Sequence, residues 1–408
     1  NKFCPHIKRE LFINGMEPEE ICNYHNSSGG MHNLPPQFAT WLHGRYKKGI
    51  EGNYRLAGFS RNLRKSFQIE NRIIGPNHPP FVIAEVGINH EGKLDKALEC
   101  VDQAVNAGAE VVKFQCHITE NEMIPTDMKP GEISDERLWD IIKRCELTKD
   151  EEQTVQAYCN DKGVMYLSTP FSREAADRLN KMDVPAFKIG SGECNNLPLL
   201  DHIAAMGKPM ILSTGMNDFD SVKRSVSVIR KHDVPLALMH CTSMYPTPYE
   251  KVRLGAVSQL LREFPDMPVG LSDHSINIWT CLGAVALGAS LVEKHFTPSR
   301  SWFGPDVGIS IEPDELKRMI AGTNAIWQSR GGTKTILDEE QPVIDFAFAT
   351  VVTIAPVKAG EIFSKDNIWV KRPGTGEIKA ADFKPLLEKE ATTNIKSDSH
   401  IKWSDVNE

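Results

Sequence analysis

The sequence predicts a (β/α)8 barrel followed by a small, mostly β domain. Eight short apolar segments recur between residues 80 and 300, and helix-length amphipathic stretches separate them. This alternation is typical of a parallel sheet with crossover helices. Nearly every apolar segment ends in a polar cluster, and the carboxyl ends of the strands form the active face of a barrel. The pattern therefore predicts an enzyme as well as a fold.

The elements follow one another in a regular order. The first predicted strand, 81–88, precedes a helix over 94–109 whose leucines and valines repeat at helical spacing. The last helix, 313–330, ends at Gly331-Gly332, which is a good stop signal. Between them we expect helices near 135–145 and 148–162, and strands at 110–115, 164–169, 186–191, 209–214, 236–241, 269–274 and 291–296.

The domain boundaries follow from changes in composition along the chain. The barrel is predicted over 68–332, and a connector over 333–347. Residues 348–408 contain short strands and turns, and a domain of about 60 residues is only marginally stable alone. We therefore expect it to dock on the barrel or on a second copy. Residues 1–67 carry no motif and are interpreted as an extension of unknown role, either packed on the barrel or left from a further domain.

Composition excludes several classes of protein. The net charge of −7 argues against general nucleic-acid binding. No apolar run approaches the roughly 18 residues needed to span a bilayer, and the first residues do not resemble a secretory signal. The nine cysteines have no metal-like spacing, so we expect buried thiols and a cytoplasmic location.

Two histidines at neighbouring strand ends predict a metal site. His274 ends the seventh predicted strand and His295 lies near the end of the eighth. Because these strands are adjacent in a barrel, both imidazoles can reach one point. Two histidines with open positions suit a divalent metal that polarises a carbonyl group. Asp273 is a candidate for a supporting carboxylate.

Two lysines inside apolar strands predict a site for an anion. Lys113 and Lys188 would be costly to bury without a partner, so an ammonium group at the active face implies a bound anion. Gly190 and Gly192 allow backbone N–H groups to approach closely. Hydroxyl groups stand at four strand ends, and together these features describe a pocket for a phosphate and a carboxylate: Thr169, Ser191, Ser213 and Ser272.

Carboxylates complete the predicted site. Glu85 lies inside the first strand and Glu193 follows the fourth. Each can be a partner for a lysine or a proton shuttle for a polyol substrate, and these two interpretations are compatible. Asn89, His90, Tyr245 and Asp306 are further candidates for sugar contacts or for ordering loops.

These segments closely resemble the sialic acid synthase family over roughly residues 68–408. The resemblance is carried by AEVGINHEG, VVKFQ, LSTPFS, FKIGSGECNN, ILSTGMN, HCTSMYPTPYE, GLSDHS and EKHFT, in that order. The segments DFAFATVV and NIWVKRPGTG resemble the junction and the C-terminal domain of the family, which is called antifreeze-like or SAF. The resemblance implies condensation of phosphoenolpyruvate with N-acetylmannosamine, with C–O cleavage, to give N-acetylneuraminate and phosphate.

The resemblance also implies roles for individual residues. His274 and His295 would hold a divalent metal, usually Mn²⁺, with Mg²⁺ or Co²⁺ as alternatives. The phosphoenolpyruvate site would comprise Lys113, Thr169, Lys188, Ser191, Ser213 and Ser272. The sugar or the attacking water would face Glu85, Gln115, Glu193, Tyr245 and Asp306. Arg372 would reach the N-acetyl group in the partner subunit of a domain-swapped homodimer.

Three alternatives to a neuraminate synthase stay open. Ser243 stands where bacterial neuraminate synthases have Asn, so a legionaminate or pseudaminate synthase, acting on a diacetamido-trideoxyhexose, is the main alternative. A synthase of an eight-carbon keto acid phosphate would need a further basic cluster at the strand ends, and none is apparent. A glycan- or ice-binding protein would not need lysines inside barrel strands.

Overall fold

The computed structural model describes residues 46–48, 54–56, 66–131 and 135–407. The chain divides into two compact units, residues 1–331 and 332–408, and each is described by itself. Most of the predicted N-terminal extension lies outside the described residues. Within it, β1 (Tyr46–Lys48) pairs antiparallel with β2 (Tyr54–Leu56).

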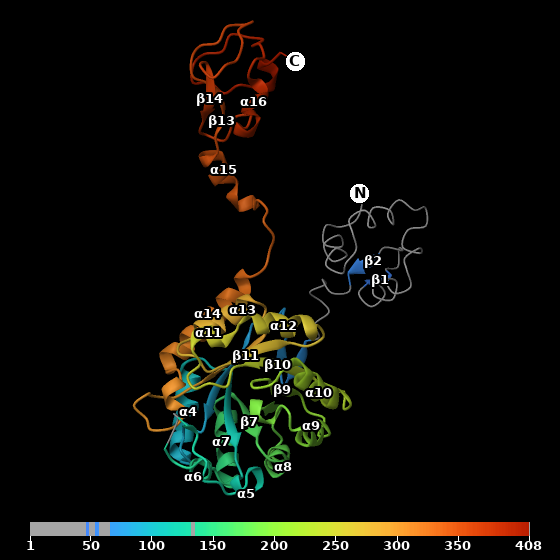
Figure 1. The fold of residues 1–408 in the computed structure, drawn as a ribbon. Helices are drawn as coiled ribbons and strands as arrows, with labels where there is room; N and C mark the ends of the chain where they lie inside the picture. The colour runs from blue at the N-terminus through green and yellow to red at the C-terminus, as the bar shows by residue number, and fades with distance from the viewer. Residues whose placement is uncertain (1–45, 49–53, 57–65, 132–134, 408) are drawn as a thin grey trace. The chain divides into compact units, whose positions relative to one another are not determined.

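The first unit contains a closed barrel of eight parallel strands, which confirms the predicted fold (Figure 1). The strands neighbour one another in chain order, and the last closes on the first. They are β5 (Phe81–Gly87), β6 (Val111–Cys116), β7 (Met165–Pro170), β8 (Phe187–Ile189), β9 (Met210–Ser213), β10 (Leu236–Cys241), β11 (Val269–Asp273) and β12 (Leu291–His295). Only β8 is much shorter than predicted, because the chain turns at Gly190 into the 3₁₀ helix Ser191–Glu193.

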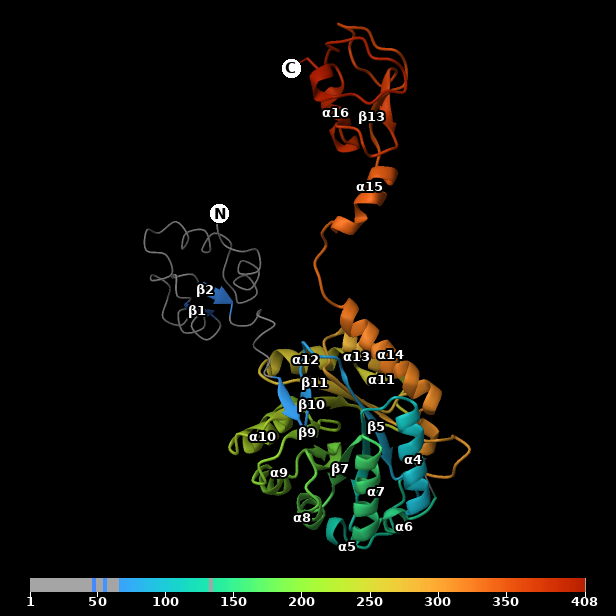
Figure 2. The ribbon, with the colours of Figure 1, turned by 180° about the vertical axis from the view of Figure 1, so that it is seen from behind.

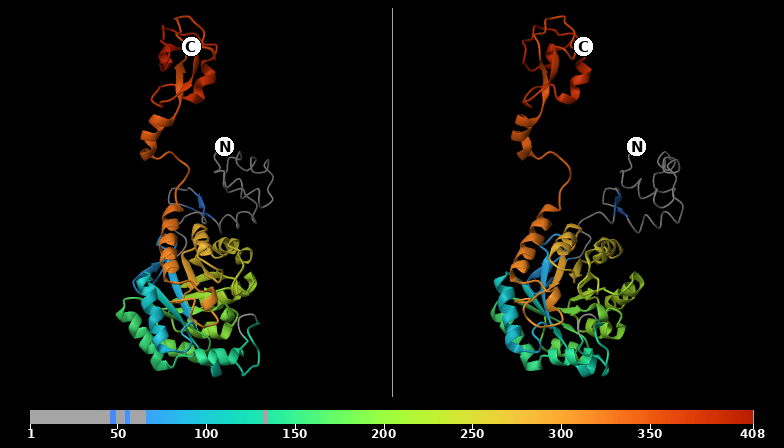
Figure 3. Two further views of the ribbon diagram at one scale, coloured as in Figure 1. Left: turned by 90° about the vertical axis from the view of Figure 1, so that its left-hand side faces the viewer. Right: turned by 60° about the vertical axis from the view of Figure 1, so that its left-hand side comes forward.

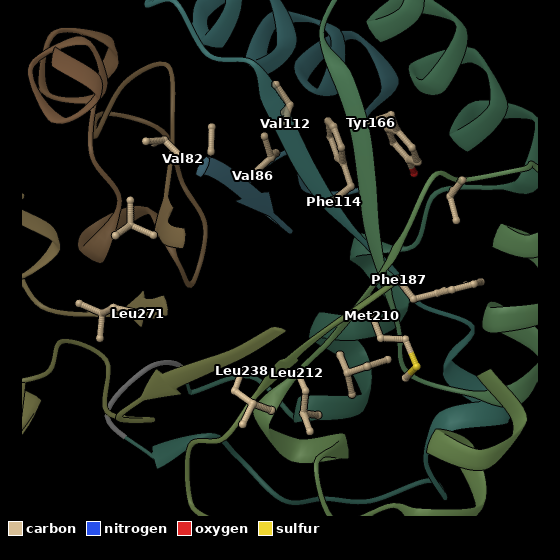
Figure 4. Packing of buried hydrophobic residues seen from close by; sticks show 14 of the residues in the cluster. Val82, Val86, Val112, Phe114, Tyr166, Phe187, Met210, Leu212, Leu238 and Leu271 are labelled. Atoms are coloured by element: carbon tan, nitrogen blue, oxygen red, sulfur yellow. The ribbon is translucent and has the colours of Figure 1, made fainter. Parts of the chain in front are cut away.

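Helices surround the strands in every view (Figures 2 and 3). They are α4 (Leu94–Asn106), α5 (Thr119–Glu122), α6 (Leu138–Cys145), α7 (Lys149–Asp161), α8 (Arg173–Lys181), α9 (Leu197–Ala204), α10 (Phe219–Arg230), α11 (Tyr249–Val252), α12 (Gly255–Glu263), α13 (Trp279–Ala286) and α14 (Pro313–Ser329). The side chains on the outer strand faces pack against these helices and form the larger core. Figure 4 shows part of it, including Val112, Phe114 and Leu271. No helix among the described residues is long and apolar enough to cross a membrane.

The inside of the barrel has an apolar layer at the amino ends of its strands. Ile83, Val111 and Leu291 are among its members. The hairpin of β3 (Phe67–Ile69) and β4 (Arg72–Ile74) adds Ile69 and Ile74, both fully buried in the same cluster. Successive side chains of a strand alternate in direction, so the next inward positions lie nearer the carboxyl ends. Those positions hold polar residues, and the chemistry is therefore confined to one end of the barrel.

The second unit has its own small core. β13 (Thr350–Thr353) pairs antiparallel with β14 (Ile368–Lys371), and short helical turns follow, including α16 (Phe383–Leu386). Val351, Phe363 and Ile378 are fully buried in its apolar cluster. α15 (Gln341–Ala347) precedes the strands. The unit has short strands and turns, as the sequence predicts.

Candidate active site

Glu293 on β12 lies at the centre of a buried charged layer inside the barrel. Its Oε1 is 3.1 Å from the Lys188 Nζ, and the Ser272 hydroxyl donates a hydrogen bond of 2.8 Å to the same oxygen. Its Oε2 is 3.7 Å from the Lys113 Nζ. Each of these four side chains is at least nine-tenths buried. The layer therefore joins β6, β8, β11 and β12 through two buried ion pairs and one hydrogen bond.

Lys113 extends the layer to two further strands. Its Nζ lies 2.5 Å from the Glu85 Oε2 on β5 and donates a hydrogen bond of 2.9 Å to the Thr169 hydroxyl on β7. Gln115, two residues further along β6, donates a hydrogen bond of 3.0 Å to the Glu85 Oε1. Glu85 therefore has the lysine partner expected for it, and each buried ammonium group has a carboxylate partner within the barrel.

The pKa values of the two carboxyl groups in this layer shift in opposite directions. Burial raises the pKa of Glu85, and the contact with Lys113 does not fully offset it. Burial also acts to raise the pKa of Glu293, but Lys113 and Lys188 outweigh it and hold that pKa below its usual value. Burial lowers the pKa of Lys188. When Glu85 carries a proton, two ammonium groups face one carboxylate, and the layer has an excess positive charge that favours an anion.

Hydroxyl groups at two further strand ends complete this side of the site. Ser213 on β9 is buried, and its Oγ has no hydrogen-bond partner among the described residues. The Ser191 Oγ accepts a hydrogen bond of 3.0 Å from the backbone N–H of Gly215. A Cβ at Gly215 would lie 2.7 Å from that oxygen and 2.5 Å from the Ser243 Oγ, so only glycine fits between the two hydroxyl groups.

The two histidines lie together at the top of the barrel. The ring centroids of His274 and His295 are 5.3 Å apart. The His295 Nδ1 is buried without a hydrogen-bond partner among the described residues, and the Asp306 Oδ2 lies 3.7 Å from it. Burial, reinforced by His274, lowers the pKa of His295 well below its ordinary value, which keeps the ring neutral with a free lone pair.

This donor set fits a divalent metal with open coordination positions. In the part of the chain that the structure describes, no three His, Cys, Asp or Glu side chains are arranged to hold a metal by themselves. Two imidazoles would therefore leave positions for substrate or water, which is the arrangement of a Lewis-acid site. The residues present fit the metal that the sequence predicts.

Tyr245, Asp306 and Gly87 surround the histidines. The Tyr245 ring stacks on His274 at a centroid distance of 4.1 Å, and 37% of the residue is exposed. Burial raises the pKa of Asp306 to about 6. Gly87 has a φ of +56°, and a Cβ there would lie 3.3 Å from both the Asp306 Oδ2 and the Gln115 Nε2. Glycine therefore keeps the space between these polar groups open.

Other predicted residues lie apart from this cluster. Glu193 is half-buried in the loop after β8, where Asn196 donates a hydrogen bond of 2.6 Å to its Oε2 and burial raises its pKa. Asn89 is buried, and its amide donates to the Phe296 carbonyl and the Ser310 hydroxyl, so it orders loops. His90 is fully buried, and burial lowers its pKa to about 4.

Arg372 belongs to the second unit. Its guanidinium lies 5.8 Å from the centroid of the Phe346 ring. Its role at the barrel site stays a prediction.

Asp273 does not support His274 as predicted. Its carboxylate is 2.6 Å from the Lys294 Nζ and accepts a hydrogen bond from the Ser275 hydroxyl. The reason is the alternation of side chains, since Ser272 and His274 face the site while Asp273 faces the helices. The same alternation could have identified Glu293, which is two residues before His295 in a buried strand and was not predicted.

Comparisons with known proteins identify the family of this chain. Residues 100–335 match the NeuB family, and residues 348–407 match the SAF domain. The chain is 37% identical over 332 residues to N,N'-diacetyllegionaminic acid synthase of Campylobacter jejuni, covering 79% of this chain and 98% of that protein. It is 31% identical over 339 residues to human N-acetylneuraminate-9-phosphate synthase, covering 81% and 93%.

A solved structure gives the same result. The N-acetylneuraminic acid synthetase of Leptospira borgpetersenii, in complex with citrate, superposes with a TM-score of 0.63 at 33% identity. The match covers 69% of this chain and 95% of that chain. The barrel, the C-terminal domain and these matches together show that the chain belongs to the NeuB family, the family of the sialic acid synthases.

Proposed function

We propose that this protein condenses phosphoenolpyruvate with the open-chain form of N-acetylmannosamine, giving N-acetylneuraminate and phosphate. The observation that carries the proposal is the buried layer of Lys113, Lys188 and Glu293 inside the barrel, with Glu293 two residues before His295 on β12. The relatives are named as synthases of N,N'-diacetyllegionaminic acid, N-acetylneuraminate-9-phosphate and N-acetylneuraminic acid, and these names support a sugar acid synthase.

The charged layer suits phosphoenolpyruvate because this substrate carries a phosphate and a carboxylate. Lys113 and Lys188 supply the positive charge, and the partnerless Ser213 hydroxyl can donate to an anionic oxygen. Further hydroxyl groups at the carboxyl ends of β7, β8 and β11 come from Thr169, Ser191 and Ser272. The charge on this substrate is present before the reaction, so the lysines serve binding and orientation as much as the barrier.

His274 and His295 would hold the divalent metal, with Mn²⁺ proposed and Mg²⁺ or Co²⁺ as alternatives. When bound, the metal polarises the sugar aldehyde. Asp306 beside His295 and Tyr245 against His274 border the place where the sugar would lie. Gln115 reaches the same space past Gly87.

Glu85 is the proposed group for moving protons. C3 of phosphoenolpyruvate forms a bond to the aldehyde carbon, and the aldehyde oxygen takes up a proton to become a hydroxyl group. Water adds at C2 and gives up a proton, and the C2–O bond breaks to release phosphate. The carboxylate form of Glu85 would take the proton from that water. The raised pKa of Glu85 and its place between Lys113 and Gln115 suit this task, and Glu193 is the alternative.

A second copy of the chain is the proposed partner, in a domain-swapped homodimer. Large apolar side chains are exposed on the loops that follow β9 to β12 and at the first residues of α11 and α13, at the rim of the site: Met216, Met244, Tyr249, Ile276, Trp279 and Phe303. Such a rim suits a covering domain. Arg372 from the partner would then reach the N-acetyl group of the sugar.

A legionaminate or pseudaminate synthase is the alternative function. Ser243 faces Gly215 and Ser191 at the edge of the site, and its short side chain leaves room for a substituent on the sugar. A diacetamido-trideoxyhexose carries such a substituent. The barrel layer and the metal site would serve either reaction unchanged.

The test is phosphate release from phosphoenolpyruvate in the presence of Mn²⁺ with three sugars offered separately. They are N-acetylmannosamine and the 2,4-diacetamido-2,4,6-trideoxyhexoses of manno and altro configuration. Turnover with N-acetylmannosamine is expected. Turnover with only a diacetamido sugar would show that the protein is a legionaminate or pseudaminate synthase. No phosphate release with any of the three sugars would overturn both proposals.

A further inference from the structure

A buried histidine and glutamate lie behind Gln115 and have no role in the chemistry described so far. The His117 Nδ1 is 3.0 and 2.9 Å from the two carboxylate oxygens of Glu122 on α5. Its Nε2 is 3.0 Å from the Gln115 Oε1. The Phe171 ring stacks on the imidazole at 4.4 Å and 12°, and His117 is only 4% exposed. The ring is therefore held on its face and at both nitrogens.

The donors and acceptors in the series of hydrogen bonds from Glu122 to Glu85 determine where the hydrogens lie. The Gln115 Oε1 accepts only, so the His117 Nε2 donates to it. The His117 Nδ1 and the Glu122 carboxyl group share one proton between them. The Gln115 amide, with its oxygen bound to His117, can present only its NH₂ group to Glu85, as observed.

The orientation of the Gln115 amide affects the candidate active site, because this amide reaches the space beside Gly87 and contacts Glu85. The Gln115 Nε2 borders the same space beside Gly87 as the Asp306 Oδ2 and the His295 Cε1. With the NH₂ group forward, Gln115 donates to Glu85 and leaves that group a carboxylate able to take a proton. With the amide reversed, its oxygen would face Glu85, and the two oxygens would require a proton between them.

We propose that His117, paired with Glu122, is a positioning residue that fixes the Gln115 amide so that its NH₂ group faces Glu85. The inference rests on the proposed function, because it assigns Glu85 the proton that the reaction releases. His117 itself contacts no reacting atom.

Two amide variants of His117 provide a matched test. In His117→Gln, the NH₂ group can take the place of the Nε2 and still donate to Gln115. In His117→Asn, the shorter side chain takes the place of the Nδ1, pairs with Glu122 and falls short of Gln115. We expect kcat of His117→Asn to fall about tenfold, the loss that one hydrogen bond explains, with little change in the KM for phosphoenolpyruvate. His117→Gln should recover most of that loss.

A purely structural role for His117 predicts the opposite order. The side chain that satisfies the buried Glu122 would then be the better replacement, so kcat in His117→Asn at or above that in His117→Gln would overturn the inference. Thermal melting of both variants, and Mn²⁺ binding by calorimetry, separate misfolding and loss of metal from loss of positioning.

A spectroscopic measurement tests the inference without any turnover. In the full-length protein labelled with ¹⁵N-histidine, the Nε2 of His117 should carry a hydrogen, with the signal assigned by comparison with His117→Gln. A bare Nε2 would mean a reversed amide and would overturn the inference. A hydrogen on the Nε2 in a protein that turns over no sugar would refute the proposed function and leave the positioning of Gln115 intact.

Discussion

Replacing Glu293 with Gln tests whether the charged layer holds two buried ammonium groups with too little negative charge. The change keeps the shape of the side chain and an oxygen that accepts from Ser272, but it removes the charge that faces Lys113 and Lys188. Removing one partner of a buried ion pair costs about 3–5 kcal/mol. We expect about 3 kcal/mol, since the retained oxygen still accepts hydrogen bonds.

This magnitude can be measured as a melting temperature. At about 2–4 °C for each kcal/mol in a large domain, Glu293→Gln should melt about 6–12 °C below the wild-type protein in buffer free of phosphate. An anion that binds the ammonium groups should restore most of the stability that the variant has lost. Phosphate at 100 times its Kd would return about 2.7 kcal/mol, and the variant should gain more from it than the wild type.

The control is Glu263→Gln, because Glu263 is about half exposed and lies 3.4 Å from Lys223 at the surface. Exposed pairs contribute about 0.2–1 kcal/mol, so this variant should melt close to the wild type in either buffer. Two results would contradict the claim that Glu293 balances two buried ammonium groups. One is a melting temperature of Glu293→Gln close to that of Glu263→Gln. The other is an increase in melting temperature with phosphate that is no larger for Glu293→Gln than for the wild type.

Three further predictions concern the metal, the second unit and the N-terminal segment. His274→Ala and His295→Ala should each lose Mn²⁺ and activity while the barrel stays folded by circular dichroism; full metal occupancy in both would remove the metal assignment. Arg372→Ala should raise the KM for the sugar far more than the KM for phosphoenolpyruvate, and equal changes would argue against a contact with the N-acetyl group. Deletion of residues 1–65 should leave the condensation intact, whereas deletion of 1–75 should destabilise the barrel because it removes the β3–β4 hairpin; loss of catalysis in a folded 1–65 deletion would show that the segment contributes to the site.

The sequence was sufficient to predict the barrel because its strands are buried on both faces. Each appears as a short apolar run, and the polar clusters mark the strand ends that meet at one face. The pairing of Lys113 with Glu85 could be anticipated, since an ammonium inside a strand requires a partner. The proximity of His274 and His295 followed from the adjacency of the last two strands.

The sequence was not sufficient where the direction of a side chain decides its role. Asp273 and Lys294 alternate outward and pair behind the site, although each is next to a predicted metal ligand. Glu293 alternates inward and organises the charged layer, yet it stands in the sequence as one more polar residue beside Lys294. His117 and Glu122 come together through the turn between β6 and α5, which no strand or helix period encodes.

The central claim is tested most directly with phosphoenolpyruvate that carries ¹⁸O in the bridging C–O–P position. The protein is incubated with Mn²⁺ and each candidate sugar, and the phosphate and the sugar acid are analysed by mass spectrometry. Phosphate that carries the label, released only when an accepted sugar is present, is the result that we predict. Label retained in the sugar acid, or phosphate released at the same rate without sugar, would contradict a condensation by C–O cleavage at this site.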